Sequence, residues 1–198
     1  MCNLYHLRQT SDEVARTFLA DAENGGNFAA EVYPGYPGLV VAEGRVRIMN
    51  WGFPLRLKAM KPTSKSKPVT NARDDKLATS FWHDSFELRR CLIPMSQWAE
   101  PEGEARRMTR TWYAPAGEEL FAVAGLWRPT AEWDDAYAMV MTNSSPQMAN
   151  VHDRMPVILR QQDWQLWTEG TPREAVGLVQ TWPGELAVER TADRWAGT

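Results

Sequence analysis

Residues 90–101 read Arg-Cys-Leu-Ile-Pro-Met-Ser-Gln-Trp-Ala-Glu-Pro, an apolar run that ends on a carboxylate. A short apolar run of this kind is typical of a buried strand, and we predict one over residues 91–98. Glu100 then lies at the strand's end beside Trp98. There, loss of water raises the pKa of a carboxyl toward values useful for proton transfer. The local pattern equally fits a surface glutamate.

On both sides of this run, short apolar segments alternate with turns. Further strands are predicted over residues 110–113, 120–127, 137–142, 156–159 and 186–189, and a hairpin over 39–42 and 46–51. Helices are predicted over residues 10–22, 162–167 and 172–180. Thr10 and Glu13 form a capping box for the first of these helices. Many strands and few helices in irregular order predict a single α+β domain over 1–198, mostly antiparallel, with a barrel-like core and a few peripheral helices.

Composition sets limits on location and chemistry. The chain has 198 residues and a net charge of −3, a length that suits one domain. We expect a cytoplasmic protein, associated with the nucleoid in a bacterium, because the sequence shows neither a signal-peptide pattern nor an apolar run of about 20 residues. Cys2 and Cys91 are then expected as free thiols. No cluster of Cys and His has metal-ligand spacing, so we predict neither a metal nor a cofactor.

Positive charge gathers in one part of the chain. Residues 45–110 hold fourteen basic and seven acidic residues, and residues 55–73 hold six basic residues and no acid. Such a local field suits a phosphate backbone, and it also fits a solvated basic loop. Lys65 and Lys67 belong to residues 54–70, which contain three prolines and are predicted to form a long loop.

Cys2 is the first residue with distinctive chemistry. Methionine aminopeptidases act when the second residue is small, so removal of Met1 would leave an N-terminal cysteine. Its α-amine (pKa about 7.7–8.0) and thiol (about 8.5) would both be partly unprotonated near neutral pH. The amine can form an imine with an aldehyde, and the sulfur can then close a thiazolidine ring. An internal cysteine cannot do this, because its nitrogen is an amide.

Two further segments carry candidate site residues. Val-Thr-Asn-Ala-Arg at 69–73 offers the amide of Asn71 and the planar guanidinium of Arg73, which suits phosphate. Val-His-Asp-Arg at 151–154 offers His152, whose neutral-range pKa suits a proton shuttle, and Arg154. Taken singly, an ordinary turn and a loop histidine bonded to Asp153 explain the same residues.

Together and in this order, these segments resemble the SRAP family of SOS response-associated peptidases, or abasic-site processing proteins. The opening Met-Cys-Asn-Leu-Tyr is similar to that family's Met-Cys-Gly-Arg start. The other matching elements are Trp51-Gly52, Asn-Ala-Arg at 71–73, Arg-Cys-Leu-Ile-Pro-x(5)-Glu at 90–100 and His-Asp-Arg-Met-Pro-Val-Ile-Leu at 152–159. The resemblance covers roughly residues 1–160, leaving 161–198 as C-terminal helices and a strand.

The resemblance implies a sensor and covalent trap of abasic sites in single-stranded DNA. Cys2 would be the nucleophile, and Asn71 would hold the ring-opened sugar. Glu100 would assist proton transfer and autoproteolytic removal of Met1. His152 would assist ring opening, lyase-type Schiff-base chemistry and slow reversal. Residues expected to bind DNA are Arg73, Arg154, Trp51, Lys65 and Lys67.

The sequence departs from the family pattern at three positions. Leu4 stands where many relatives have Arg, which removes one expected phosphate contact. Pro101 replaces an aromatic residue that often follows the catalytic Glu, and Phe81 stands where a basic residue is expected. The basic segment at 56–67 would offset the resulting loss of DNA affinity.

Three other functions remain open on the sequence alone. An N-terminal-nucleophile amidohydrolase also exposes a cysteine after Met1, but such enzymes usually continue Cys-Gly-Ile. A non-covalent single-stranded DNA-binding protein would use tryptophans on bases and lysines on phosphates. A conventional peptidase would act on other proteins. We expect a monomer that binds no membrane, with the replication machinery as a possible partner.

Overall fold

A closed barrel of five strands forms the larger part of the molecule. The computed structural model describes residues 2–22, 28–56, 59, 61 and 63–195. The barrel strands are β4 (Pro37–Ala42), β5 (Arg45–Trp51), β9 (Arg90–Met95), β12 (Phe121–Thr130) and β13 (Asp134–Asn143). Their order is β13-β12-β9-β4-β5, and a parallel pairing of β13 with β5 closes the ring. The predicted α+β fold with a barrel-like core is therefore confirmed.

The β4–β5 hairpin forms where the sequence predicts it. Glu43 and Gly44 both adopt positive φ, 54° and 72°, as the two-residue turns of tight hairpins require. Gly38 serves a different purpose in β4. A Cβ there would collide with the hydroxyl groups of Tyr5 and Tyr137. Those two buried hydroxyls share a hydrogen bond of 2.5 Å, so the glycine leaves room for a polar contact inside the core.

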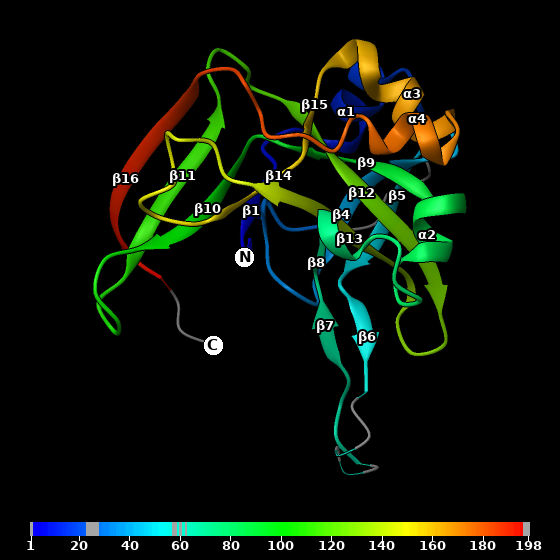
Figure 1. Ribbon diagram of the computed structural model, residues 1–198, viewed down its shortest axis with the longest axis horizontal. Coiled ribbons are helices and arrows are strands. Elements are labelled where there is room, and N and C mark those ends of the chain that lie inside the picture. Colours follow the sequence, from blue (N-terminus) through cyan, green and yellow to red (C-terminus); the bar gives the residue numbers. More distant parts are fainter. Residues whose placement is uncertain (1, 23–27, 57–58, 60, 62, 196–198) are drawn as a thin grey trace.

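A second, antiparallel sheet lies beside the barrel (Figure 1). Its strands, in spatial order, are β16 (Leu186–Arg194), β11 (Thr109–Pro115), β10 (Gln97–Glu102), β1 (Tyr5–His6) and β3 (Glu31–Val32). Only Ser96 separates β9 of the barrel from β10 of this sheet. The apolar run at 90–101 thus supplies one strand to each sheet, and the predicted single strand over 91–98 is two strands.

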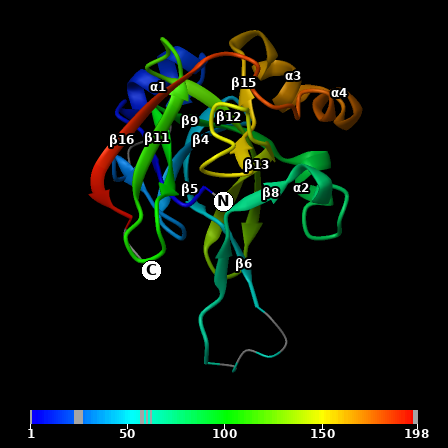
Figure 2. The same ribbon diagram turned by 60° about the vertical axis from the view of Figure 1, so that its left-hand side comes forward.

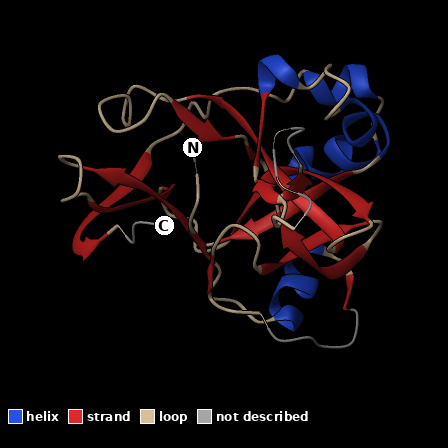
Figure 3. Ribbon diagram, turned by 90° about the horizontal axis from the view of Figure 1, so that it is seen from below, coloured by secondary structure: helices blue, strands red, loops and turns tan. Residues whose placement is uncertain are grey.

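The helices lie on the barrel side of the molecule, away from the second sheet (Figure 3). They are α1 (Ser11–Phe18), α2 (His83–Leu88), α3 (Trp164–Glu169) and α4 (Pro172–Val176), with the 3-10 turns η1 (Asp74–Lys76) and η2 (Gln161–Asp163). The capping box of Thr10 and Glu13 begins α1 as predicted. The helix ends at Phe18, short of the predicted Ala22, because Leu19 turns left-handed.

Short strands complete the fold. They are β2 (Asp21–Ala22), β6 (Phe53–Leu55), β7 (Lys67–Val69), β8 (Asn71–Arg73), β14 (Arg154–Pro156) and β15 (Ile158–Leu159). Strands β6 and β7 pair with each other and project from the body as a ribbon (Figure 2). The predicted loop over 54–70 is therefore wrong at its two ends. Residues 57, 58, 60 and 62, within the predicted loop, lie outside the described residues.

In the described part of the chain, every helix is too short or too polar to cross a membrane.

Candidate functional site between the barrel and the second sheet

Cys2 lies three residues before Tyr5, the first residue of β1, which lies between β10 and β3 in the second sheet. Its side chain is fully buried, and its thiol donates a long hydrogen bond of 3.5 Å to the carbonyl of Leu4. Burial raises the pKa of the Cys2 thiol well above its usual value, and the nearby carboxylate of Glu100 acts in the same direction. The thiol is therefore held in its neutral, protonated form.

Asn71 begins β8, which pairs with barrel strand β13. Its Nδ2 donates to the backbone carbonyl of Cys2 at 2.9 Å and to Oγ1 of Thr70 at 2.7 Å. Its Oδ1 is buried and has no hydrogen-bond partner among the described residues. Both donor hydrogens of the amide are thus used for positioning, while its acceptor remains available. Buried acceptors are rarely left unsatisfied, so this oxygen is a candidate ligand contact.

Glu100 lies in β10 and is fully buried. Burial raises the pKa of its carboxyl to about 8, and the negative charge of Asp153 adds to this shift. A carboxyl with this pKa is largely protonated at neutral pH and can both give and take a proton there. The surface-glutamate interpretation of the 90–101 run is therefore wrong.

His152 lies in the loop between β13 and β14. Its side chain is 18% exposed, and its Nδ1 lies 2.9 Å from the backbone nitrogen and 3.1 Å from the carbonyl oxygen of Arg154. Burial lowers the pKa of the imidazole, so the ring is neutral at pH 7. Nδ1 can accept from the first atom or donate to the second, and the position of the ring proton depends on which of these bonds forms.

Four distant segments thus contribute to one region. The hydrogen bond from Asn71 to Cys2 ties β8 of the barrel to the start of the second sheet. The negative charge of Glu100 raises the pKa of Cys2, and the negative charge of Asp153, next to His152, raises the pKa of Glu100. The described residues therefore place a thiol, an amide and a high-pKa carboxyl together, with the 152–154 loop beside them.

The residues expected to bind DNA fall into three groups. Arg73 and Arg154 pair with acidic neighbours: Arg73 with Asp75 at 2.9 Å, and Arg154 with Asp74 at 2.7 Å. Lys65 and Lys67 are exposed at the β7 end of the ribbon. Trp51 is fully buried, so it offers no surface to DNA in this structure.

Trp51 supports the candidate site from inside the core instead of facing solvent. Its indole N–H donates to the carbonyl of Thr70 at 3.3 Å, and the backbone N–H of Met139 donates to the same oxygen at 2.8 Å. Thr70 in turn accepts from Asn71. Sequence reasoning did not single out Thr70, although its position directly before Asn71 was a usable signal. Trp51 supports the strand that orients Asn71.

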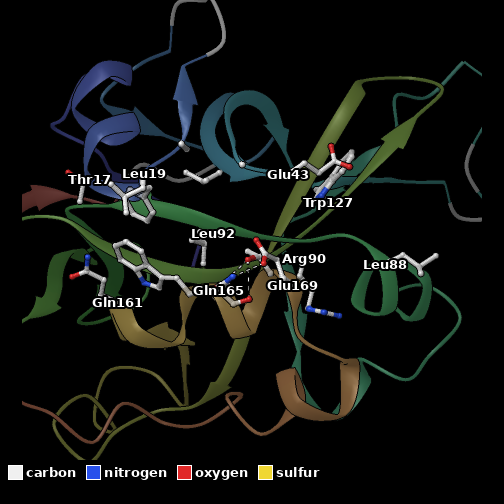
Figure 4. A pocket seen from close by; sticks show the side chains of 16 residues that line it. Thr17, Leu19, Glu43, Leu88, Arg90, Leu92, Trp127, Gln161, Gln165 and Glu169 are labelled. Carbon is white, nitrogen blue, oxygen red and sulfur yellow. Dashed lines mark hydrogen bonds between the residues drawn. The ribbon is translucent and has the colours of Figure 1, made fainter.

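Two of the cavities in the described part of the molecule bear on the site. One of about 610 Å³ lies among α1, α3 and the barrel, with Trp127, Leu92 and Gln165 in its wall (Figure 4). It contains none of the candidate site residues. The other, of about 550 Å³, is lined by Asn3 and Leu4 next to Cys2. Among the described residues, no three His, Cys, Asp or Glu side chains gather as a metal site.

Fold and site define a class of protein: an α+β barrel whose second residue is a buried cysteine, held beside a carboxyl of raised pKa. The family model described as SOS response associated peptidase (SRAP) matches residues 1–194, and the chain belongs to this family. Membership of the SRAP family supports a DNA-damage-associated, peptidase-like function. The match extends beyond the roughly 160 residues that the motifs cover.

Solved structures share the fold. A protein from Bordetella bronchiseptica superposes with a TM-score of 0.81 at 22% identity, covering 96% of this chain and 99% of its own. A protein from Bacteroides thetaiotaomicron gives 0.81 at 16% identity, covering 96% and 91%. A phage-related protein from Bordetella bronchiseptica gives 0.70 at 18% identity, covering 96% and 94%. No curated protein matches the sequence significantly.

Proposed function

We propose that this protein captures abasic sites in single-stranded DNA as a covalent thiazolidine on Cys2, once Met1 has been removed. The observation that carries the proposal is the hydrogen bond of Asn71 to Cys2 in a buried site shared with Glu100. A thiol alone would support many reactions. A second-position cysteine, next to a group able to exchange protons near pH 8, is suited to imine and thiazolidine chemistry.

The reaction begins with the ring-opened sugar, whose C1 is an aldehyde. The free α-amine of Cys2 attacks C1, and the carbinolamine that forms loses its hydroxyl as water when an acid donates a proton. The thiol sulfur then adds to the imine carbon, and the thiol proton moves to the imine nitrogen. One C–N bond and one C–S bond form, one water leaves, and no oxidant or reductant is needed.

The side chains around Cys2 have matching roles in this scheme. Glu100 supplies the proton that expels water, because its raised pKa keeps it protonated at neutral pH. The open Oδ1 of Asn71 accepts a hydrogen bond from a sugar hydroxyl. His152 assists ring opening and takes part in reversal. Holding both reactants in place can contribute up to roughly 7–11 kcal/mol.

Removal of Met1 fits the peptidase-like character of the family. The amine of Cys2 exists only after the bond between Met1 and Cys2 is hydrolysed. Glu100 in its ionised form can activate water for this step, since a pKa of about 8 leaves a usable fraction of carboxylate at pH 7 to 8. Self-processing therefore needs no second active site.

DNA binding in this scheme depends on charge rather than on base sequence. Lys65 and Lys67 on the ribbon, with Arg73 and Arg154 after exchange of their carboxylate partners, would contact phosphates. Phosphate contacts carry no sequence information. A single strand is the expected substrate, because a duplex would have to unstack before its sugar reached the buried Cys2.

A denaturing gel tests the proposal. Protein with a native N-terminus is mixed with an oligonucleotide that contains one abasic site, and intact mass confirms loss of Met1. We expect a slower band from the wild type and from Cys91→Ala, the matched loss of the other buried thiol. Without a reductant, Cys2→Ala and protein with an N-terminal extension should give no stable band. Cys2→Ala and Cys2→Ser both keep the α-amine, so borohydride should trap their imines.

A wild type that binds the oligonucleotide but gives no stable band would reject covalent capture and leave a non-covalent single-strand binder. A stable band that persists in Cys2→Ala would reject ring closure by the Cys2 thiol.

A further inference from the structure

A cavity next to Cys2 has aromatic walls that the capture chemistry does not use. It has a volume of about 550 Å³, and its lining includes Tyr33, Tyr36, Arg110 and Trp195, together with Asn3 and Leu4. We call it the aromatic cavity. Asn3 and Leu4 directly follow Cys2 in the chain, so the cavity lies beside the proposed nucleophile.

The walls of the aromatic cavity are held in place by the second sheet. Tyr33 and Trp195 pack on a small apolar cluster of Leu4, Ala99 and Trp112, separate from the main core. Trp195 follows β16, and its backbone N–H donates to the carbonyl of Met108 at 2.9 Å. This bond holds the backbone of Trp195, the last described residue, next to Met108 and so limits where its ring can lie. The cavity exists before any ligand arrives.

Charges in the wall are already balanced. Arg110 pairs with Glu31 at 3.1 Å, and the hydroxyl of Tyr33 donates to Glu31 at 2.6 Å. Arg110 also donates to the Tyr33 hydroxyl at 3.1 Å. With its guanidinium engaged in this way, Arg110 fixes the orientation of the Tyr33 ring. The cavity therefore suits a flat, neutral, aromatic group better than a phosphate.

Tyr36 lies at the cavity's rim and is 58% exposed, unusually open for a tyrosine. Its ring lies 6.2 Å from that of Tyr33 at an angle of 64°. The two rings meet edge to face, and much of the Tyr36 ring surface stays exposed at the rim. Nucleobases stack on faces of this kind with little regard to sequence, because every base has a π-face.

We propose that the aromatic cavity holds the nucleobase of a nucleotide directly adjacent to the captured abasic sugar. This inference rests on the proposed function, since it places the sugar at Cys2. A base stacked on Tyr36 and Trp195 would anchor the strand so that the baseless position falls on the thiol. Purines should bind better than pyrimidines, because they offer a larger ring surface.

The test uses oligonucleotides with a central tetrahydrofuran, an abasic analogue that has no aldehyde and cannot be crosslinked. Fluorescence anisotropy gives Kd for the normal oligonucleotide and for two others, in which the 5′ or the 3′ neighbour also lacks its base. Removing one of these two bases should weaken wild-type binding by about tenfold, which is within the range for base–aromatic stacking. Removing the other should change little.

The same measurements on Tyr36→Ala show which base the cavity holds. The variant should bind the normal oligonucleotide about tenfold more weakly and should no longer distinguish it from the one that lacks the sensitive base. Tyr36→Phe keeps the ring and should behave as wild type. Val176→Ala, an exposed site on α4, is the control. Thermal unfolding checks that each variant folds, and Trp195→Ala repeats the test from another wall.

Equal sensitivity to the base in wild type and in both alanine variants would overturn the proposal. Crosslinking by the same proteins separates this failure from failure of the proposed function. If the wild type captures a true abasic site while base removal has no effect, the function stands and the cavity proposal falls. If base removal matters but no crosslink forms, the cavity binds bases and covalent capture is rejected.

Discussion

In the proposed function, the buried floor of the site and the β6–β7 ribbon would meet DNA in opposite ways. On the floor, Cys2, Asn71 and Glu100 are all at least nine-tenths buried and are oriented by hydrogen bonds or burial. On the ribbon, Lys65 and Lys67 are exposed. Bond formation needs fixed atoms, whereas attraction to a polyanion needs only charge within reach. Mutations on the floor should therefore change rates, and mutations on the ribbon should change affinity and its dependence on salt.

The largest effect should come from Glu100→Gln, which removes the proton donor while keeping the shape. In protein whose loss of Met1 is confirmed by intact mass, we expect capture to slow by about 10²- to 10⁴-fold, the usual contribution of a positioned acid or base. Glu102→Gln, two residues along β10 and paired with Arg190, is the matched control and should be near wild type. Equal rates for wild type and Glu100→Gln in gel time courses would remove Glu100 from the mechanism.

The pH dependence of stability tests the same residue without DNA. The folded protein keeps a proton on Glu100 up to about pH 8, whereas an unfolded chain releases it near 4.5. The native state therefore binds more protons between these values, and this group makes stability fall as pH rises through that window. Tm of Glu100→Gln should fall less than that of wild type between pH 5 and pH 8.5. Parallel Tm profiles would mean that the carboxyl ionises normally.

A smaller loss of rate is expected from Asn71→Ala, which removes the bond to the Cys2 carbonyl and the open acceptor together. A displacement of about 1 Å in a reacting group can cost roughly 10²-fold. Asn71→Asp keeps an acceptor but loses the donor to Cys2, and should fall between wild type and Asn71→Ala in single-turnover capture. If the aspartate variant is slower than the alanine variant, the acceptor role is wrong.

Gly38→Ala should lower the stability of the folded protein, and with it the stability of the floor. The added methyl collides with the paired hydroxyls of Tyr5 and Tyr137, and overpacking of this kind costs about 1–3 kcal/mol. For a chain of this size we expect Tm to fall by roughly 2–4 °C per kcal/mol. Tyr137→Phe should relieve part of the loss in the double variant. Additive losses in the double variant would show that the hydroxyl pair is not the obstacle.

The smallest effect should come from the ribbon. Replacing Lys65 and Lys67 by alanine should weaken binding of single-stranded DNA a few-fold at moderate salt. The slope of log Kd against log salt should fall by roughly 0.7 for each phosphate that the variant no longer neutralises. Capture at saturating DNA should be unchanged, as it should be for Arg173→Ala on α4. A changed capture rate at saturation would show that the ribbon helps to position the sugar.

Much of the fold could be predicted because its signals are local. The hairpin at 39–51 follows from apolar runs around Glu43-Gly44, and α1 from its capping box. Helix α2 (His83–Leu88) was not predicted, because it is short and no side chain caps its first turn. The division of residues 90–102 between two sheets was also hidden, since a change of pairing partner leaves no periodic trace in an apolar run.

The candidate site residues could be named from the sequence, but their arrangement could not. The resemblance selected Cys2 and Asn71, yet their contact spans 69 positions of sequence, and only tertiary structure brings them together. Trp51 was expected to meet DNA because the family resemblance implies a place for it in the DNA-binding cleft. The structure buries it, since its strand closes the barrel against β13. Asp74 and Asp75, the partners of Arg154 and Arg73, stand out in the sequence as an acidic pair. Which arginine each one contacts depends on how the ends of β8 and β14 lie in space.

The single residue between β9 and β10 has a consequence for how substrate reaches the site. The two sheets are joined by the single residue Ser96, by the further connections from β3 to β4 and from β11 to β12, and by the hydrogen bond from Asn71 to Cys2. They therefore have little freedom to open and close around a strand. Folding alone orders the reacting groups, so in the proposed function the DNA backbone must change its conformation to reach them. Selectivity for damaged DNA should then depend on how easily a strand bends at the damaged position.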